Sequence, residues 1–319
     1  MTTTRLTPFS SATAMLQALQ TRQISSVELL ELHLQQIEQR NPTLNAIVTP
    51  DFERARRASE ESDAARAHGD VRPLLGLPLT IKDCLDVQGL PTTAGDPKRA
   101  QAIAAKDGLV AARVRAAGAV IMGKTNVPLY AGDWHADNRL FGRTYNPWDR
   151  SRTPGGSTGG GAVAVAAGMT PLEFGSDIAG SLRVPAAFCG CYGHSPSTTA
   201  LPRSGHFPGS PLPNSTLTMA VQGPLARLAT DLELALQVTA GPEIGEDPAW
   251  HIALPPARHE RLREYRVALL PPFPWLPIEN EILEARDRLA ADLRRLGAQV
   301  EEAQPETFGD GRAFYHLYF

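Results

Sequence analysis

The most constraining feature of this sequence is a stretch rich in glycine and other small residues over residues 152–196. It contains two serines set among glycines: Ser157 in Gly-Gly-Ser-Thr-Gly-Gly, and Ser181 after Ile-Ala-Gly. Glycine permits positive φ and a close approach of other atoms to the backbone, at an entropic cost to folding. A chain that accepts this cost twice around a hydroxyl group is expected to present backbone N–H groups and a serine Oγ to a ligand.

Three simpler interpretations of the first serine segment are less consistent with its surroundings. A flexible Gly/Ser linker does not run directly into the Ala/Val helix that residues 162–168 predict. A phosphate-binding loop requires a lysine after its glycines, where this chain has Ala162. Residues 155–159 match the G-x-S-x-G nucleophile elbow, but an elbow follows a buried strand. Residues 146–154 are polar and interrupted by proline, so the elbow context fails.

The second serine segment suits the hydrolysis of an amide by nucleophilic catalysis. This reaction needs a nucleophile, a base that later returns the proton, and hydrogen-bond donors for the tetrahedral oxyanion. The residues before Ser181 are flexible enough to turn several N–H groups toward one point. The predicted oxyanion hole consists of the backbone N–H groups of Ile178, Ala179, Gly180 and Ser181.

Two residue types remain candidates for the base. Histidine is not excluded, but none of the eight histidines stands in a recognisable triad context, and His194 and His206 are consistent with simple loop residues. Lysine acts as a base when burial lowers its pKa from about 10.4 toward neutrality, a difference of roughly 4 kcal/mol. A hydroxyl group between lysine and nucleophile can relay the proton, which gives a Ser-Ser-Lys arrangement.

The sequence resembles the amidase signature family. Residues 155–160 and 175–190 resemble that family's GGSSGG and G-[ST]-D-x-G-G-S-[IL]-R-x-P-[AS]-A-F-C-G segments. Pro78-Leu-Thr-Ile-Lys-Asp83 is similar to the family's lysine segment. The resemblance extends from about residue 20 to the end of the chain. Residues 123–126, 141–149 and 223–227 match further family segments.

The resemblance implies a fold and a set of roles. It implies an α/β/α sandwich with a central mixed β-sheet covered by helices, and no metal or cofactor. Ser181 is similar to the family's nucleophile, Ser157 to its bridging serine and Lys82 to its base. The bridging serine of the family follows a cis peptide bond, which here is Gly156–Ser157. Without the resemblance, a lone lysine such as Lys82 is better interpreted as a solvated residue at a strand end.

Three further residues of these segments have expected supporting roles, and Ala179 departs from the family pattern. Thr158 replaces the family's second serine and keeps a hydroxyl group that can support the lysine. Asp177 and Arg183 are predicted to form an ion pair or to cap the loops around Ser181. Ala179 stands where the family has glycine, which is tolerable only if φ there is negative.

Composition limits the functional class and the compartment. A net charge of −3 gives no reason to expect nucleic acid or an anionic membrane as a partner. Three cysteines without regular spacing suggest a reducing compartment, and Cys84 and Cys189 are predicted to be buried apolar residues. The sequence shows no signal peptide, and no apolar run approaches the roughly 20 residues of a transmembrane helix. We therefore expect a cytoplasmic protein.

We predict a single amidase-like domain over residues 1–319. It is divided into a helical N-terminal segment over 1–70, a catalytic core over 71–240, and the start of an incomplete C-terminal part over 241–319. The segment 197–217 is predicted to be a loop. Helices are predicted over 25–41, 52–68, 109–117, 231–238 and 279–296, and strands over 77–82, 119–122, 265–270 and 299–301.

The predicted function is the hydrolysis of a small-molecule carboxylic amide to an acid and ammonia or an amine. One alternative is the glutaminase component of a tRNA-dependent amidotransferase, which requires a partner subunit. Another is a truncated, non-catalytic homologue that acts as a binding scaffold. Because chains of the family continue well past this point, we expect an uncovered apolar face and strand edge. We therefore expect weak or absent activity and a homo-oligomeric or aggregation-prone state.

Overall fold

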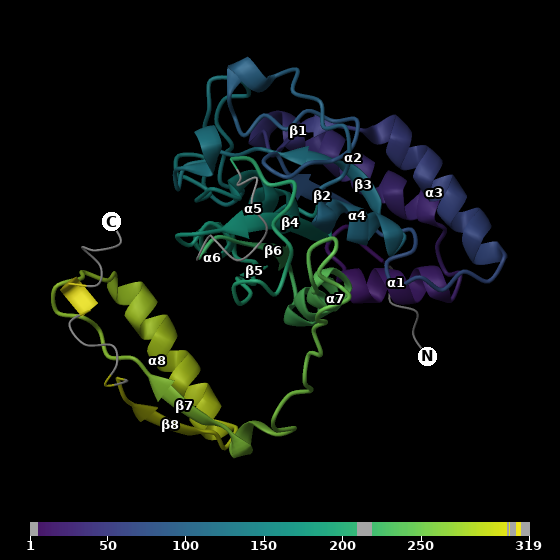
Figure 1. The fold of residues 1–319 in the computed structure, drawn as a ribbon. Coiled ribbons are helices and arrows are strands. Elements are labelled where there is room, and N and C mark those ends of the chain that lie inside the picture. Colours follow the sequence, from purple (N-terminus) through teal and green to yellow (C-terminus); the bar gives the residue numbers. More distant parts are fainter. Residues whose placement is uncertain (1–5, 209–218, 305, 307–310, 314–319) are drawn as a thin grey trace. The chain divides into compact units, whose positions relative to one another are not determined.

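The computed structural model describes residues 6–208, 219–304, 306 and 311–313 (Figure 1). The chain forms two compact units, Met1–Ile252 and Ala253–Phe319, which are described separately. The predicted single domain, with divisions at residues 70 and 240, stays a prediction.

The first unit contains a mixed six-stranded sheet with the strand order β1-β3-β2-β4-β6-β5. Strand β2 is parallel to β3 and β4, whereas β1, β6 and β5 are antiparallel to their neighbours. Its strands are β1 (Ile47–Pro50), β2 (Pro78–Lys82), β3 (Val120–Thr125), β4 (Leu172–Asp177), β5 (Tyr192–Gly193) and β6 (Val221–Ala226).

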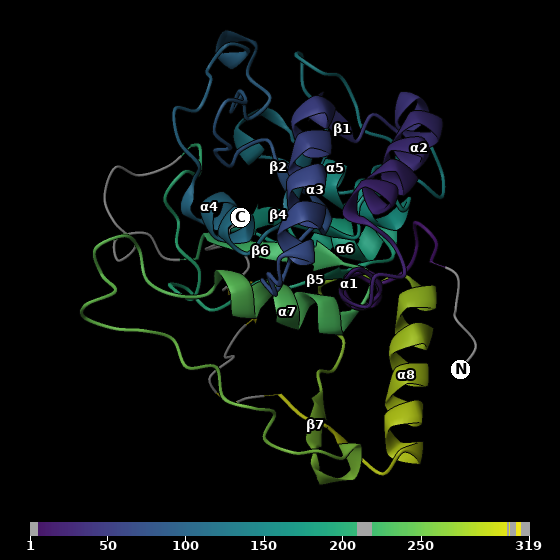
Figure 2. The same cartoon turned by 90° about the vertical axis from the view of Figure 1, so that its right-hand side faces the viewer.

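Helices cover both faces of this sheet, as Figures 1 and 2 show. Helices α1, α4 and α7 share one apolar core with the sheet, and α2, α5 and α6 share the other. The predicted α/β/α sandwich with a central mixed sheet is thus confirmed. The helices are α1 (Ala12–Gln20), α2 (Ser26–Leu44), α3 (Phe52–Ala67), α4 (Leu109–Ala116), α5 (Gly159–Ala166), α6 (Arg183–Cys189) and α7 (Ala229–Thr239), with short 3-10 turns η1 (Pro97–Arg99) and η2 (Leu129–Ala131).

The alternation of side chains along β2 determines where its lysine points. Leu79 and Ile81 belong to the apolar core that is shared with α1, α4 and α7. Successive side chains of a strand face opposite sides of a sheet, so Lys82 lies on the face that α5 covers. All five residues of β2 are buried, and the interpretation of Lys82 as a solvated strand-end residue is wrong.

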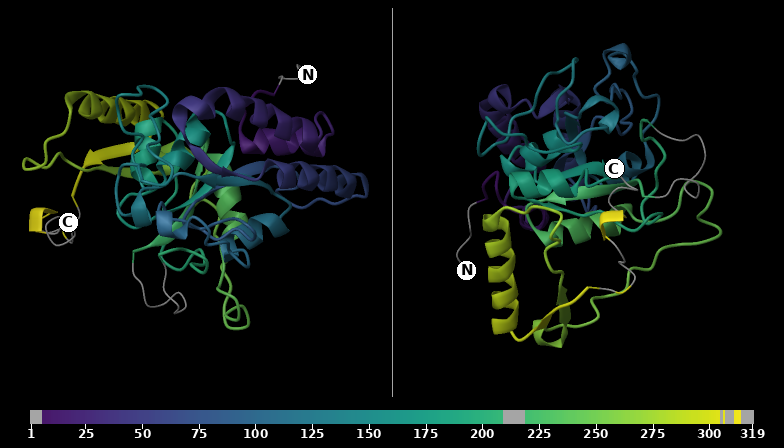
Figure 3. Two further views of the ribbon diagram at one scale, coloured as in Figure 1. Left: turned by 90° about the horizontal axis from the view of Figure 1, so that it is seen from above. Right: turned by 90° about the vertical axis from the view of Figure 1, so that its left-hand side faces the viewer.

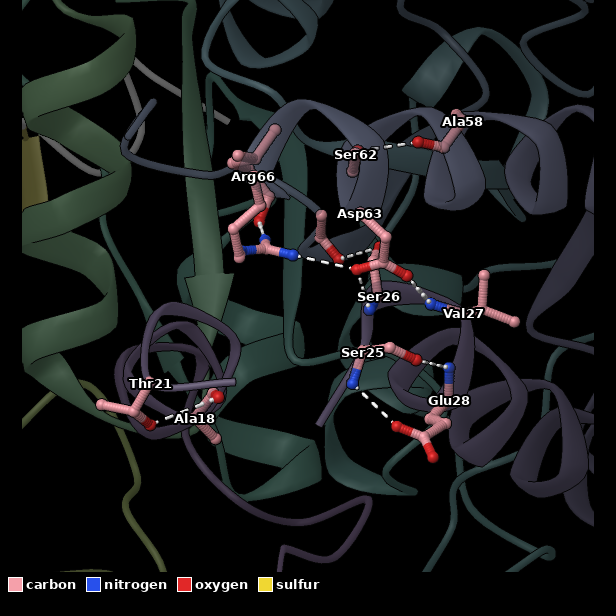
Figure 4. A network of polar contacts seen from close by, with 12 residues as sticks. Ala18, Thr21, Ser25, Ser26, Val27, Glu28, Ala58, Ser62, Asp63 and Arg66 are labelled. Carbon is pink, nitrogen blue, oxygen red and sulfur yellow. Dashed lines mark hydrogen bonds and ion pairs between the residues drawn. The ribbon is translucent and has the colours of Figure 1, made fainter. Parts of the chain in front are cut away.

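The N-terminus of α2 has a capping box, formed by Ser25 and Glu28 (Figure 4). The backbone N–H of Glu28 donates to Ser25 Oγ at 3.0 Å, and the Glu28 carboxylate accepts from the Ser25 N–H at 2.8 Å. Asp63 of α3 accepts from the N–H of Ser26 at 2.7 Å and pairs with Arg66 at 3.0 Å (Figure 4). These contacts join α2 and α3 beside the sheet.

Several boundaries differ from those predicted. Helix α2 continues to Leu44, so the predicted end at Asn41-Pro42 is wrong. Pro42 lies in the last turn of the helix, where the loss of one N–H removes only a single intrahelical bond. Strands β1, β4, β5 and β6 and helix α6 are not among the predicted elements. The part of the predicted 197–217 loop that covers 209–217 lies outside the described residues.

The second unit is a small β-α-β unit, drawn in yellow-green in Figure 3. Strand β7 (Arg266–Leu269) is parallel to β8 (Gln299–Glu302), and α8 (Asn280–Arg295) connects them. The 3-10 turn η4 (Leu262–Glu264) precedes β7. These elements agree with the predicted ones to within a few residues at each end. Across the described residues of both units, no helix is long and apolar enough to cross a membrane.

Candidate active site

Lys82 is the centre of the polar cluster at the end of β2. Its Nζ lies 2.7 Å from Ser157 Oγ, 3.0 Å from Ser176 Oγ and 3.4 Å from the Ser176 carbonyl oxygen. The side chain is completely buried. Burial lowers the pKa of Lys82, although the nearby Cys84 and acidic groups oppose that shift. A buried amine of this kind has a larger neutral fraction near pH 7 than an exposed lysine.

Ser157 enters this cluster from the loop before α5. It is buried, and the peptide bond Gly156–Ser157 is cis, as the family resemblance implied. A Cβ on Gly156 would lie only 2.6 Å from the carbonyl oxygen of Asp133, so the chain needs glycine there. The loop is therefore held close to the segment around Trp134, where a larger residue has no room.

Ser181 lies in the turn between β4 and α6, and the Asp177 carboxylate organises this turn. Asp177 accepts from the N–H groups of Gly180 at 2.8 Å and Leu182 at 3.0 Å, and it pairs with Arg183 at 2.9 Å. Burial alone would raise the pKa of Asp177, but Arg183 and these N–H donors hold it below its usual value. The predicted ion pair is thus present, and it fixes the turn that carries Ser181.

The two serine segments lie side by side. The Thr158 N–H donates to the Ser181 carbonyl oxygen at 3.1 Å, and the Thr158 hydroxyl donates to the Ser176 carbonyl oxygen at 3.2 Å. Lys82 Nζ and the Thr158 hydroxyl contact the same carbonyl oxygen, that of Ser176, and the support of Lys82 by Thr158 stays a prediction. A Cβ on Gly175 would lie 2.4 Å from Thr158 Cγ2, so glycine permits this close approach.

The predicted oxyanion donors need one correction. The N–H of Gly180 points at Asp177 and is already engaged by its carboxylate, so Gly180 is not a donor in this structure. Gly180 has φ of +97°, whereas Ala179 is not among the residues with positive φ, as its replacement of glycine requires. The Trp134 Nε1–H donates to the Ala179 carbonyl oxygen at 3.1 Å. Ile178, Ala179 and Ser181 stay the predicted donors.

Ser176, Cys84 and His206 also contact the cluster, although none of them was a predicted site residue. His206 Nε2 lies 3.0 Å from Ser176 Oγ and 3.6 Å from Cys84 Sγ, so His206 is more than the simple loop residue expected from the sequence. Cys84 is buried as predicted, but its thiol contacts polar groups. Burial by itself raises the pKa of Cys84, yet His206 and Lys82 together lower it to about 7.

The other predicted residues lie outside the polar cluster. Cys189 is buried, and its thiol donates to the Pro154 carbonyl oxygen at 3.4 Å. Burial raises the pKa of this thiol, as expected for an unreactive cysteine.

Within the described ranges, no group of three or more His, Cys, Asp or Glu side chains is arranged to hold a metal ion.

The buried Glu173 is expected to make the stability of the fold depend on pH. This residue of β4 is fully buried and accepts a hydrogen bond from Thr125 Oγ1 at 2.5 Å. Burial raises its pKa from 4.5 to about 8, so between these values the folded state binds more protons than the unfolded state. Stability from this group therefore decreases as the pH rises through that window.

Glu173→Gln keeps the size of the side chain and removes the ionisation. We expect the melting temperature of the variant to decline less between pH 5 and pH 8 than that of the original chain, and to exceed it at pH 8. Thermal unfolding followed by circular dichroism across this range measures the difference. Parallel pH profiles for the two chains would contradict a neutral, buried Glu173.

The chain is similar to known amidases over nearly its whole length. Residues 28–318 match the model of the Amidase family. An acylamidase from Rhodococcus erythropolis is 38% identical over 305 residues, which are 93% of this chain and 62% of that protein. A glutamyl-tRNA(Gln) amidotransferase subunit from Synechococcus sp. (strain CC9605) is 35% identical over 306 residues, 94% of this chain and 61% of that protein.

Solved structures show the same similarity. A bacterial aryl acylamidase described as an amidase signature enzyme superposes with a TM-score of 0.84 at 29% identity, over 93% of this chain and 61% of its own. A peptide amidase from Stenotrophomonas maltophilia superposes with a TM-score of 0.80 at 27% identity, over 92% of this chain and 62% of its own. The chain thus spans less than two thirds of the length of these relatives.

Proposed function

Because this chain belongs to the amidase family, we propose that it hydrolyses a carboxylic amide to an acid and ammonia or an amine through an acyl-enzyme on Ser181. Lys82 carries this proposal, since its buried Nζ lies 2.7 Å from Ser157 Oγ and its pKa is lowered. A lysine held in this way against a hydroxyl group is suited to accept a proton. Ser181, on the neighbouring segment, is the nucleophile that this base serves.

In the proposed reaction, the neutral Lys82 amine takes the proton of Ser157 while Ser157 Oγ takes the proton of Ser181. Ser181 Oγ forms a bond to the amide carbon, and the electron pair of the C=O π bond moves to the oxygen. The N–H groups of Ala179 and Ser181 donate to this oxyanion. Collapse of the intermediate breaks the C–N bond, and the leaving nitrogen receives the proton back through Ser157. Water then hydrolyses the ester on Ser181 by the same transfers.

The relatives also support a second candidate function. The 35% identity to an amidotransferase component is close to the 38% identity to an acylamidase, so sequence similarity alone does not separate the two. As a glutaminase component, the chain would act on glutamine together with a partner subunit. The cytoplasm remains the predicted compartment and a homo-oligomer the predicted state.

A panel of amides distinguishes these functions. The purified chain is offered small aliphatic amides, anilides such as p-nitroacetanilide, amino-acid amides and glutamine, and the released acid and amine are quantified. We expect hydrolysis of at least one non-glutamine amide by the chain alone. Activity confined to glutamine, and dependent on added amidotransferase partners, would favour the alternative. No release from any amide, together with no reaction of Ser181 with an alkyl fluorophosphonate, would overturn both and support a binding scaffold.

A further inference from the structure

We propose that His206 is a positioning residue that acts through Ser176 to aim the lone pair of the Lys82 amine at Ser157. This inference rests on the proposed function, because it concerns how Lys82 is prepared to act as a base. Its basis is the direction of the hydrogen bonds along the contacts His206–Ser176–Lys82–Ser157.

The carbonyl oxygen of Pro208 determines the direction of these hydrogen bonds. His206 Nδ1 lies 2.8 Å from the Pro208 carbonyl oxygen, which can only accept, so Nδ1 carries the proton. In a neutral imidazole the other nitrogen then carries a lone pair. Ser176 Oγ lies 3.0 Å from that nitrogen, and its hydroxyl group donates to it. The hydrogen of Ser176 is thereby directed away from Lys82.

The orientation of Ser176 determines how Lys82 is oriented. With its hydrogen given to His206, Ser176 Oγ accepts from Lys82 Nζ at 3.0 Å, and the Ser176 carbonyl oxygen is a second acceptor at 3.4 Å. A neutral amine has two N–H groups and one lone pair, and both N–H groups are now occupied. The lone pair is left facing Ser157 Oγ, 2.7 Å away, where the proton has to be taken up.

Without the imidazole of His206, the Ser176 hydroxyl group no longer has the acceptor that directs its hydrogen away from Lys82. The Ser176 hydroxyl group can then turn and donate to the lone pair of Lys82, in competition with Ser157. Cys84 is a weak substitute, because its Sγ lies 3.7 Å from Ser176 Oγ and the loss of His206 also removes a contact that lowers the pKa of this thiol. We therefore expect the variant to populate an arrangement in which Lys82 is present but cannot accept the proton of Ser157.

The backbone around His206 is held independently of the imidazole, which makes the site suitable for substitution. Leu85 and His206 form an antiparallel bridge. The Phe207 N–H donates to the Cys84 carbonyl oxygen at 2.7 Å, and the Asp86 N–H donates to the Gly205 carbonyl oxygen at 2.7 Å. These bonds involve only main-chain atoms, so side-chain variants at position 206 are expected to fold.

The test compares His206→Ala, His206→Gln, Ser176→Ala and the double variant Ser176→Ala/His206→Ala in the full chain. The control is His68→Ala, because His68, the C-cap residue of α3, is exposed and makes a similar 2.8 Å contact from Nδ1 to a backbone carbonyl. For each variant, kcat and KM are measured with the best amide of the panel. The rate at which an alkyl fluorophosphonate modifies Ser181 and the melting temperature are measured as well.

We expect His206→Ala to lower kcat and the rate of Ser181 modification by about 10- to 100-fold with little change in KM, a part of the 10²–10⁴ that a general base contributes. His206→Gln should recover most of this loss, since its amide can accept from Ser176 and donate to Pro208. The double variant should lose no more than either single variant, because both break the same chain of bonds.

Three results would overturn the inference while leaving the proposed function intact: an unchanged kcat in His206→Ala, no recovery in His206→Gln, or losses that multiply in the double variant. If the unmodified chain neither hydrolyses an amide nor reacts with the fluorophosphonate, the proposed function fails, and the inference fails with it. A loss shared by His68→Ala would also contradict a specific role for His206.

Discussion

Ser181→Ala is expected to abolish acylation and to lower kcat by at least about 10⁴-fold, the scale seen when a nucleophile is removed from a catalytic serine. The fold should be kept, because the described contact that ties Ser181 to Thr158 uses its carbonyl oxygen and not its side chain. Kinetics on the best amide substrate, with thermal unfolding alongside, measure both expectations. Ser59→Ala is a matched control, since Ser59 is also fully buried but lies on α3.

One outcome would reassign the nucleophile. If Ser181→Ala retains activity and covalent modification moves to Ser157, the first serine segment acts as a nucleophile elbow after all. Loss of activity in Ser59→Ala as well would indicate that buried serines are needed for the fold, and not for the chemistry.

Lys82→Met is expected to lower kcat by about 10²–10⁴-fold, with a smaller effect on KM, because it removes the proton acceptor and keeps an unbranched side chain of similar size. In the original chain, activity should fall as the pH decreases through the lowered pKa of Lys82, since the protonated ammonium cannot accept a proton. This acid limb should be missing from the residual activity of the variant. The profile of kcat/KM between pH 5 and pH 10 measures it.

Lys106→Met is the control for the loss of a positive charge, because Lys106 is exposed. The variant should keep the activity and the pH profile of the original chain. A Lys82 that titrates near 10.4 in the folded protein, followed by NMR, would contradict its assignment as the base. An active Lys82→Met variant would contradict it directly.

The sequence predicted those features that depend on local pattern. The strand predicted over 77–82 corresponds to β2, and the helix predicted from residue 25 corresponds to α2, which begins at Ser26. The strands β4 and β6 were missed, because neither has the apolar run expected of a fully buried strand: β4 ends in Gly-Ser-Asp, and β6 contains Gly223 and Pro224.

Contacts between residues far apart in the sequence could not be predicted from local sequence patterns. His206 meets Ser176 only because the bridge to Leu85 brings its loop beside β2, and nothing in the sequence around His206 indicates that pairing. The direction in which the Gly180 N–H points could not be predicted from the sequence either. The glycines before Ser181 predicted a turn that gathers N–H groups, but only the position of Asp177 shows that the Gly180 N–H is already engaged.

The most direct test of the account is to locate the adduct that an alkyl fluorophosphonate forms on the full chain. Trypsin leaves both serine segments in one peptide, residues 153–183, and cleavage after Glu173 separates Ser157 from Ser176 and Ser181. Fragmentation by tandem mass spectrometry then identifies the modified residue. We expect one adduct, on Ser181, that disappears in Ser181→Ala and forms slowly in Lys82→Met. An adduct on Ser157 or Cys84, or an equal rate in Lys82→Met, would contradict it.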